Sequence, residues 1–392
     1  MKADIIPVVA GLLIVIASLI SLRTGLSVAI IEILLGALAG NLGFHTEPWM
    51  IYLAGFGGII LTFLAGAEVD TKILHEKFKE SMLIGGFSFF APFLLVSLFS
   101  FFIAHWSINA SLIAGIALST TSLAVVYSVL VETGLTNTPL GKLIMASTFI
   151  TDMGTALALS IIFIKPTLLT LLFFGVSAVL IFMAAKFSLL ILRNPKLMNR
   201  IIEPEIKIIF LILLLFIFFA QLGESHAVLP AFVLGLIMSK HFSEQRKTKL
   251  VRNRLRTVAY AIVTPFFFLV GGMKISFVLI GSALGLFVIL FSLKIAAKFA
   301  GVFYFARKYI PQGYTYTTLL MSTGLTFGTI SSLFGYNAGY INQVQYSILI
   351  GVVVASAVIP TFIAQQWFMP KHTEDVEPDE EEINNKPGIT VE

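Results

Sequence analysis

Ser119-Thr-Thr-Ser-Leu123 and Ser322-Thr-Gly-Leu-Thr326 are short clusters of polar and small residues inside long apolar segments. Within hydrocarbon each backbone polar group needs a partner inside the protein, so such a cluster favours a helix that unwinds beside a cavity. The alternative is that the hydroxyl groups bond to carbonyls of their own helix or join two helices. The residues that we expect at the two helix breaks are Ser119, Thr323, Gly324 and Thr326.

The two clusters belong to an apparent internal repeat. Phe63-Leu-Ala-Gly-Ala67 precedes the first cluster and Phe268-Leu-Val-Gly-Gly272 the second, with 56 and 54 residues from Phe to the first Ser. Five-residue matches in apolar sequence also arise by chance. If one six-helix unit is used twice, a single linker helix between the copies makes the second unit enter the membrane from the opposite face. Inverted repeats with broken helices place ion sites near the bilayer midplane, where half-helix ends bring partial charges of both signs.

The composition requires a membrane. Hydrophobic residues make up 57% of the 392 residues and charged residues only 12%, which is outside the range of a soluble domain. A spanning helix needs roughly 20 mostly apolar residues. The sequence therefore predicts an all-α integral membrane protein with thirteen spans. These are residues 4–21, 26–44, 50–68, 80–105, 109–131, 139–163, 167–192, 206–221, 226–241, 257–273, 278–306, 313–336 and 345–368.

The positions of the basic residues indicate the topology. When the loops between the spans are sorted by parity, one set holds most of the Lys and Arg residues that lie in loops, and the other set holds little beyond Lys2, Lys165 and Lys274. The positive-inside rule makes the first set cytoplasmic, with the N-terminus outside the cell membrane and the C-terminus inside. The net charge of +5 is thus topological and does not indicate a nucleic-acid partner. We expect residues 1–370 to form one transmembrane domain and the acidic residues 371–392 a disordered cytoplasmic tail.

Asp152 is the outstanding ionisable residue within a span. It lies deep in residues 139–163, which contain no other carboxylate, and ionisable groups inside a membrane are costly and usually functional. A carboxylate that takes either a hard monovalent cation or a proton makes the two compete for one site, which is the chemistry of antiport. The structural alternative is that Asp152 only pairs with a lysine to hold two helices together. The candidates for further oxygen ligands of a Na⁺ site at Asp152 are Thr151, Thr120, Thr121 and Ser122.

Two lysines, Lys294 and Lys298, lie one turn apart on one face of the expected helix 278–306. Lys298 is a candidate to compensate the charge of Asp152, whereas Lys294 either reaches the interface or faces another helix. Glu32 and Glu68 are interpreted as structural, and Lys186 is given no role. The six histidines fall at span ends or in loops without a two-ligand spacing, so a resident metal site is not expected.

Six motifs follow one another along the chain: Phe63-Leu-Ala-Gly-Ala-Glu-Val-Asp70, Leu118-Ser-Thr-Thr-Ser122, Glu132-Thr-Gly-Leu-Thr-Asn-Thr-Pro-Leu-Gly141, Thr151-Asp152, Pro265-Phe-Phe-Phe-Leu-Val-Gly-Gly-Met273 and Lys298-Phe-Ala-Gly301. In this order they resemble the cation:proton antiporter-2 family, which includes bacterial sodium/proton antiporters and Kef-type potassium efflux systems. The resemblance extends over essentially all the expected spans. It implies a core domain in which the broken fifth and twelfth helices cross, a dimerisation domain, a homodimer, and elevator-like alternating access.

The resemblance also implies roles for residues. Asp152 matches the family's cation- and proton-binding aspartate, Thr121 and Ser122 match the unwound segment, and Lys298 matches the lysine that pairs with an acidic residue of the sixth helix. Electrogenic members carry two adjacent acidic residues there, whereas here the first is Thr151. Kef-type members commonly have glutamine at that position and append a nucleotide-binding domain, which we do not expect here. The expected activity is electroneutral exchange of Na⁺ for H⁺, with Li⁺ or K⁺ as other possible cations.

Other classes of function fit less well. A membrane enzyme needs a nucleophile with a base, or a metal cluster, and we find no nucleotide loop or paired histidines. A channel more often carries a filter motif contributed by several subunits. A K⁺/H⁺ antiporter of Kef type without a regulatory domain, and a membrane sensor with incidental transport, stay open as alternatives. No cofactor is expected besides the transported ions.

Overall fold

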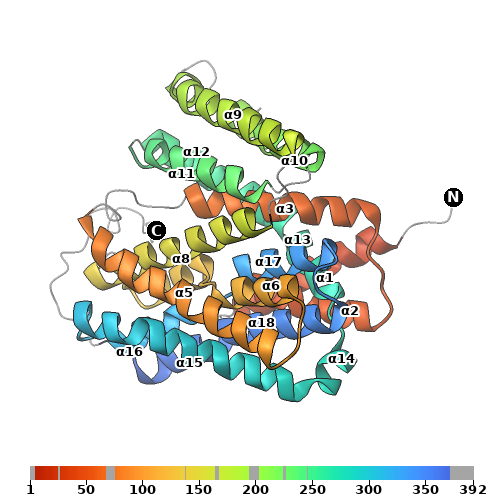
Figure 1. The fold of residues 1–392 in the computed structure, drawn as a ribbon. Coiled ribbons are helices and arrows are strands. Elements are labelled where there is room, and N and C mark those ends of the chain that lie inside the picture. The colour runs from red at the N-terminus through yellow and green to blue at the C-terminus, as the bar shows by residue number, and fades with distance from the viewer. Residues whose placement is uncertain are drawn as a thin grey trace, which may run out of the picture.

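A computed structural model of the protein describes residues 5–24, 27–67, 76–136, 138–163, 167–193, 203–223, 227–244 and 246–370. Within these ranges the regular secondary structure is helical throughout, as Figure 1 shows. The expected acidic tail, residues 371–392, lies outside the described residues, and so does Glu68.

The described residues form the following helices, in chain order. They are α1 Ile6–Thr24, α2 Val28–Asn41, α3 Pro48–Ala67, α5 Phe78–Phe102, α6 Ile108–Ser119, α7 Leu123–Glu132, α8 Pro139–Ile162, α9 Leu168–Arg193, α10 Pro204–Leu222, α11 Val228–Glu244, α12 Arg246–Val258, the π-helix η1 Ala259–Val263, α13 Thr264–Met273, α14 Phe277–Ser282, α15 Leu284–Tyr309, α16 Tyr314–Met321, α17 Thr326–Asn337 and α18 Gln343–Trp367.

Eight helical segments among the described residues are long and apolar enough to cross a membrane. Seven of them are α1, α3, α5, α8, α10, α15 and α18, and the eighth runs from Leu250 through η1 to Met273. Each coincides with a span expected from the sequence. Shorter apolar helices are α2, α6, residues 168–184 of α9, and residues 228–239 of α11. The prediction of an all-helical, multi-pass membrane protein is therefore confirmed.

Two expected spans are interrupted in mid-course. Helix α6 ends at Ser119, and Thr120 is extended, with φ −65° and ψ 154°. The helix resumes as α7 at Leu123. Helix α16 ends at Met321, and α17 begins only at Thr326. The chain leaves helical geometry at the two clusters of small and polar residues, 119–123 and 322–326.

Two other segments differ from the sequence prediction. The expected span 257–273 extends back to Arg246, because Val251 and Leu255 are buried and give basic α12 an apolar face. A hydropathy limit cannot place the start of an amphipathic helix. The expected span 278–306 is divided between α14 and α15, since Ala283 has φ −120° and ψ 28°.

Close helix contacts depend on glycine. A Cβ atom added at Gly66 of α3 would collide with the carbonyl of Phe232 in α11, and one at Gly272 of α13 with the carbonyl of Ile33 in α2. Small residues of this kind allow helix backbones in membranes to approach each other. In Figure 1, α9 and α10 lie together along one edge of the molecule and α15 and α16 along the opposite edge, with α6 and α17 between them.

Candidate functional site

The two helix interruptions lie against each other. We define the crossing as residues 120–122, between α6 and α7, together with residues 322–325, between α16 and α17. The hydroxyl of Thr121 donates a hydrogen bond to the carbonyl of Met321 at 2.8 Å. A Cβ atom added at Gly324 would lie 2.9 Å from Thr120 Oγ1. The crossing is buried from Thr120 to Ser122 and at Ser322 and Thr323. The fold therefore brings the two expected breaks together.

Most hydroxyls of the crossing bond locally. Ser119 donates to the carbonyl of Ile116 at 2.9 Å, Thr120 to that of Ala117 at 3.2 Å, and Thr323 to that of Leu320 at 2.8 Å. Ser122 Oγ accepts from the backbone N–H of Val125 at 3.5 Å, in the first turn of α7. Thr326 begins α17 and is largely buried. These bonds satisfy backbone groups at the helix ends, and Thr121 is the hydroxyl that joins the two breaks.

Lys298 anchors the end of α6. Its ammonium donates to the carbonyl of Ser119 at 2.7 Å, to Ser88 Oγ of α5 at 2.8 Å and to Thr121 Oγ1 at 3.0 Å. The last carbonyls of a helix carry a partial negative charge, so a cation there is favourable. Lys298 is fully buried. The side chain thus compensates the end of α6 through Ser119 and joins it to Ser88 and Thr121.

Asp152 of α8 is 3% exposed, and its Oδ1 atom is buried without a hydrogen-bond partner. Thr148, one turn earlier on the same face, contacts Met321 Sδ at 3.5 Å. Asp152 therefore lies on the face of α8 directed to the crossing. In the described part of the chain Asp152 and Lys298 do not form the expected ion pair. The ammonium of Lys298 instead donates its hydrogen bonds to Ser88, Ser119 and Thr121.

Thr151 lies on a different face of α8 from Asp152. Its hydroxyl donates to the carbonyl of Gly85 in α5 at 3.2 Å and to that of Ser147 at 3.1 Å. Successive residues of an α-helix point about 100° apart. Thr151 thus joins α8 to α5, and the structure does not bring its hydroxyl to the Asp152 carboxylate.

Lys294 lies one turn before Lys298 in α15. It is fully buried, and its ammonium donates to Ser356 Oγ of α18 at 2.7 Å. The same ammonium lies directly against Gly324. Ser88, Thr148 and Ser356 were not among the residues chosen from the sequence. Each is one of several hydroxyl residues in its helix, and nothing in the sequence separates it from those that serve ordinary helix packing.

A family model described as "Sodium/hydrogen exchanger, transmembrane" matches residues 9–369. The chain belongs to this family. The resemblance to monovalent cation:proton antiporters drawn from the motifs is thereby confirmed. The proteins of this family are transporters, so the expectation of a transporter in place of an enzyme agrees with this membership.

Relatives of this exchanger carry antiporter names. It is 26% identical to "Probable Na(+)/H(+) antiporter 3" of Methanocaldococcus jannaschii, over 88% of this chain and 90% of that one. It is 26% identical to "Na(+)/H(+) antiporter NhaS4" of Synechocystis, over 83% and 84%, and 27% identical to "Na(+)/H(+) antiporter" of Enterococcus hirae, over 90% and 94%.

The fold of the exchanger is similar to a solved structure, the sodium proton antiporter MjNhaP1 from Methanocaldococcus jannaschii at pH 8. The TM-score is 0.69 at 14% identity, over 91% of this chain and 95% of that one. At this identity the likeness concerns the fold alone.

Other charged residues of the exchanger lie away from these contacts. Glu32 is buried in α2 at 2% exposure, and Lys186 is exposed on α9. Among the described residues no group of three or more His, Asp or Glu side chains could hold a metal ion. The crossing with Asp152, Lys294 and Lys298 is therefore the candidate site.

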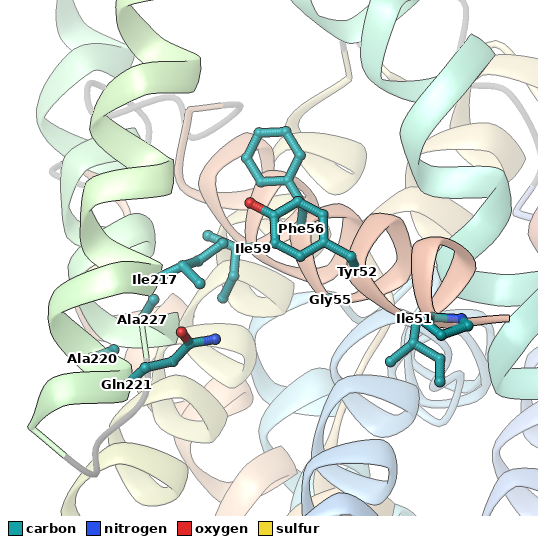
Figure 2. A pocket seen from close by; sticks show the side chains of 10 residues that line it. Ile51, Tyr52, Gly55, Phe56, Ile59, Ile217, Ala220, Gln221 and Ala227 are labelled. Atoms are coloured by element: carbon teal, nitrogen blue, oxygen red, sulfur yellow. The ribbon is translucent and has the colours of Figure 1, made fainter.

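A separate cavity of about 410 Å³ opens between α3 and α10. Figure 2 shows Tyr52, Phe56 and Ile59 from α3 with Ile217 and Gln221 from α10 around it. No Asp, Glu, Lys, Arg or His side chain lines this cavity. It contains none of the groups that exchange of a cation for a proton requires.

Proposed function

We propose that the chain is a secondary antiporter that exchanges Na⁺ for H⁺ at Asp152. The observation that carries the proposal is the Asp152 carboxylate, which is buried beside the crossing and has one oxygen without a hydrogen-bond partner. A buried, unpaired carboxylate is costly, and either a proton or a hard cation removes that cost. The names of the relatives support sodium as the cation.

The exchange follows from competition for one carboxylate. When Asp152 holds a proton it is neutral, and when it holds Na⁺ the pair is neutral as well, so either loaded form crosses the membrane at lower cost than the bare carboxylate. Backbone oxygens of residues 120–122 and 322–325 are the candidates to complete the shell of Na⁺, since hard cations prefer oxygen ligands. Thr121 and Lys298 hold the crossing in shape.

The wider architecture belongs to the same proposal. Thirteen spans in two inverted six-helix repeats, with α9 as the linker, accommodate the observed helices if four groups each count as one span: α6 with α7, α12 with η1 and α13, α14 with α15, and α16 with α17. The charge distribution favours an outside N-terminus and a cytoplasmic C-terminus. We further propose that the protein is a homodimer. The crossing would move against a dimerisation domain in an elevator-like manner.

Proteoliposomes test the function directly. Purified protein in vesicles that contain a pH-sensitive dye should release protons when Na⁺ is added outside, and Li⁺ and K⁺ should be compared at equal concentration. We expect the strongest response to Na⁺. A response to none of the three cations would rule out the antiporter, and a response to K⁺ alone would favour a potassium exchanger.

A further inference from the structure

The helical span from Leu250 through η1 to Met273 carries a cation near each end. Arg256 lies in its second turn, and Lys274 follows its last residue directly. At 1.5 Å per residue the two positions are about 27 Å apart along the helix axis, which is close to the thickness of roughly 30 Å of the hydrocarbon core of a bilayer. The two cations therefore lie at opposite faces of the membrane.

Each cation lies over a tyrosine ring of the crossing helices. Lys274 Nζ is 5.4 Å from the ring centroid of Tyr336 in α17, and it donates a hydrogen bond to Oδ1 of the next residue, Asn337, at 2.9 Å. Arg256 Cζ is 5.7 Å from the ring centroid of Tyr127 in α7. Helices α7 and α17 are the half-helices that follow the two interruptions. One span thus contacts both halves, and we call these the Lys274 contact and the Arg256 contact.

The same span is joined to α2 and α3 through its backbone. A Cβ atom added at Gly36 of α2 would collide with the carbonyl of Leu269. One added at Gly57 of α3 would lie 2.9 Å from the carbonyl oxygen of Val263. Small residues let helix backbones approach this closely, and no layer of side chains is left between the helices to repack. We therefore treat the span, α2 and α3 as one body.

The side of the span that faces α17 and α18 is packed differently. A Cβ atom added at Gly271 would lie 3.6 Å from Thr329 Cγ2 of α17 and 3.6 Å from the hydroxyl oxygen of Tyr346 in α18, which is ordinary van der Waals contact. The Tyr346 hydroxyl donates to the carbonyl of Gly271 at 2.7 Å. Here the neighbouring helices meet through side chains, which can separate without a change of the backbone.

We propose that Lys274 and Arg256 are positioning residues that hold the crossing in its described place, and that both contacts break whenever the crossing moves. The inference rests on the proposed exchange and adds the contacts that its movement must release. The Thr121 hydroxyl joins the two breaks through the carbonyl of Met321, so we expect α7 and α17 to move together. Because both contacts are formed in one structure, they stabilise the same state, and a shift along the span separates both cations from their rings in one step.

Cross-linking tests whether the contacts break. The chain contains no cysteine, so introduced thiols react alone. Lys274→Cys with Asn337→Cys spans one contact, and Arg256→Cys with Tyr127→Cys spans the other. A bifunctional thiosulfonate reagent as long as the replaced side chains should stop proton release on addition of Na⁺ to proteoliposomes, and a thiol reductant should restore it. Loss of free thiols measures the extent of cross-linking.

The matched control lies within the body of the span. Trp49 of α3 and Phe266 of α13 have ring centroids 5.4 Å apart. Cross-linked Trp49→Cys with Phe266→Cys should exchange Na⁺ for protons as fast as the same variant without the reagent, because α3 and α13 do not move against each other.

Variants without the cations give a second measurement. A contact that is lost before the transition state only stabilises the starting state, so its removal speeds departure from that state and does not slow the return. Lys274→Met and Arg256→Met should therefore each raise turnover by up to about fivefold, the range of a cation–π contact near a surface. The double variant should show the product of the two factors, since the sites are distant and act on one step. Lys274→Arg keeps the cation and should keep the wild-type turnover.

Three outcomes would overturn the inference. They are full exchange with either contact cross-linked, equal inhibition by the Trp49 and Phe266 cross-link, and a fall in turnover in Lys274→Met or Arg256→Met. The proposed function fails separately, if the wild-type protein without any cross-link does not exchange Na⁺ for protons.

Discussion

The Asp152 carboxylate and the two lysines are each buried, and they form no ion pair with one another. Lys298 is held by neutral oxygens of Ser88, Ser119 and Thr121, and one oxygen of Asp152 has no partner. An ion pair in a buried site would have to break before a cation could bind. The described arrangement leaves the carboxylate available to a proton or to Na⁺ while the lysine keeps its structural contacts.

Asp152→Asn should abolish exchange and leave a folded protein. The substitution removes the carboxylate that alternates between proton and cation, and it also removes an uncompensated buried charge, so the melting temperature should be equal or higher. Proton release on addition of Na⁺ and thermal stabilisation by Na⁺ should both be lost. Retained sodium-dependent proton flux in this variant would place the site elsewhere.

Lys298→Ala should lower stability more than it changes ion selectivity. The change leaves the Ser119 carbonyl and the Ser88 hydroxyl without their charged donor, and each buried group left unsatisfied costs about 1–3 kcal/mol. Thermal denaturation in detergent measures the loss, and the ratio of Na⁺ to Li⁺ exchange measures selectivity. A shifted ratio at unchanged melting temperature would mean that Lys298 contacts the transported ion.

At the scale of elements, the crossing depends on the close approach of two helix breaks. Gly324 allows it, because its backbone lies directly against the Lys294 ammonium and beside Thr120. Backbone dipoles of four half-helices meet there, with the Lys298 ammonium at the carbonyl end of α6. A small displacement of one break changes the position of every oxygen that Na⁺ would contact.

Gly324→Ala should lower turnover strongly with a moderate loss of stability. The added methyl group would lie 2.9 Å from Thr120 Oγ1 and push Lys294 aside. Misplacement of groups at a site by about 1 Å costs on the order of a hundredfold in rate. Gly86→Ala in α5 is the control, because its Cβ would meet no atom within 4 Å. Equal turnover in both variants would show that the crossing tolerates the displacement.

The sequence predicts the elements well where apolar stretches and small polar clusters mark them. Both interruptions follow from the Ser, Thr and Gly residues at 119–122 and 322–326, and the eight long apolar helices coincide with expected spans. It fails for α12, because a basic amphipathic helix has no hydropathy signal at its start. The partners of Lys294 and Lys298 are also not predictable, since Ser88 and Ser356 meet them only through packing of helices more than sixty residues apart.

At the scale of the molecule, the buried core separates into clusters that place the site. One cluster, which includes Phe216 of α10 and Val251 of α12, packs α9 to α12 against α3. Another, which includes Ile116 of α6 and Phe327 of α17, surrounds the crossing. Figure 1 shows α9 and α10 apart from the crossing helices, at the edge of the molecule. Such a division is compatible with movement of one part against the other, which elevator-like exchange requires.

The last prediction concerns the number of charges moved in each cycle. A site with two carboxylates can take up two protons for one cation and move net charge. Here Thr151 stands beside Asp152, and its hydroxyl is bonded to the carbonyls of Gly85 and Ser147, so Asp152 offers one exchangeable negative charge. Lys298 could supply a second proton only if cation binding broke its bonds, and its three acceptors are neutral groups outside α8. Exchange should therefore be one proton for one Na⁺, and electroneutral.

Vesicles with a sodium gradient and a clamped membrane potential measure this stoichiometry, because one-for-one exchange reaches an end point that is independent of voltage. An end point that shifts with voltage, or a sustained current on a solid-supported membrane, would require a second proton, and the Lys298→Ala variant would then tell whether that lysine carries it.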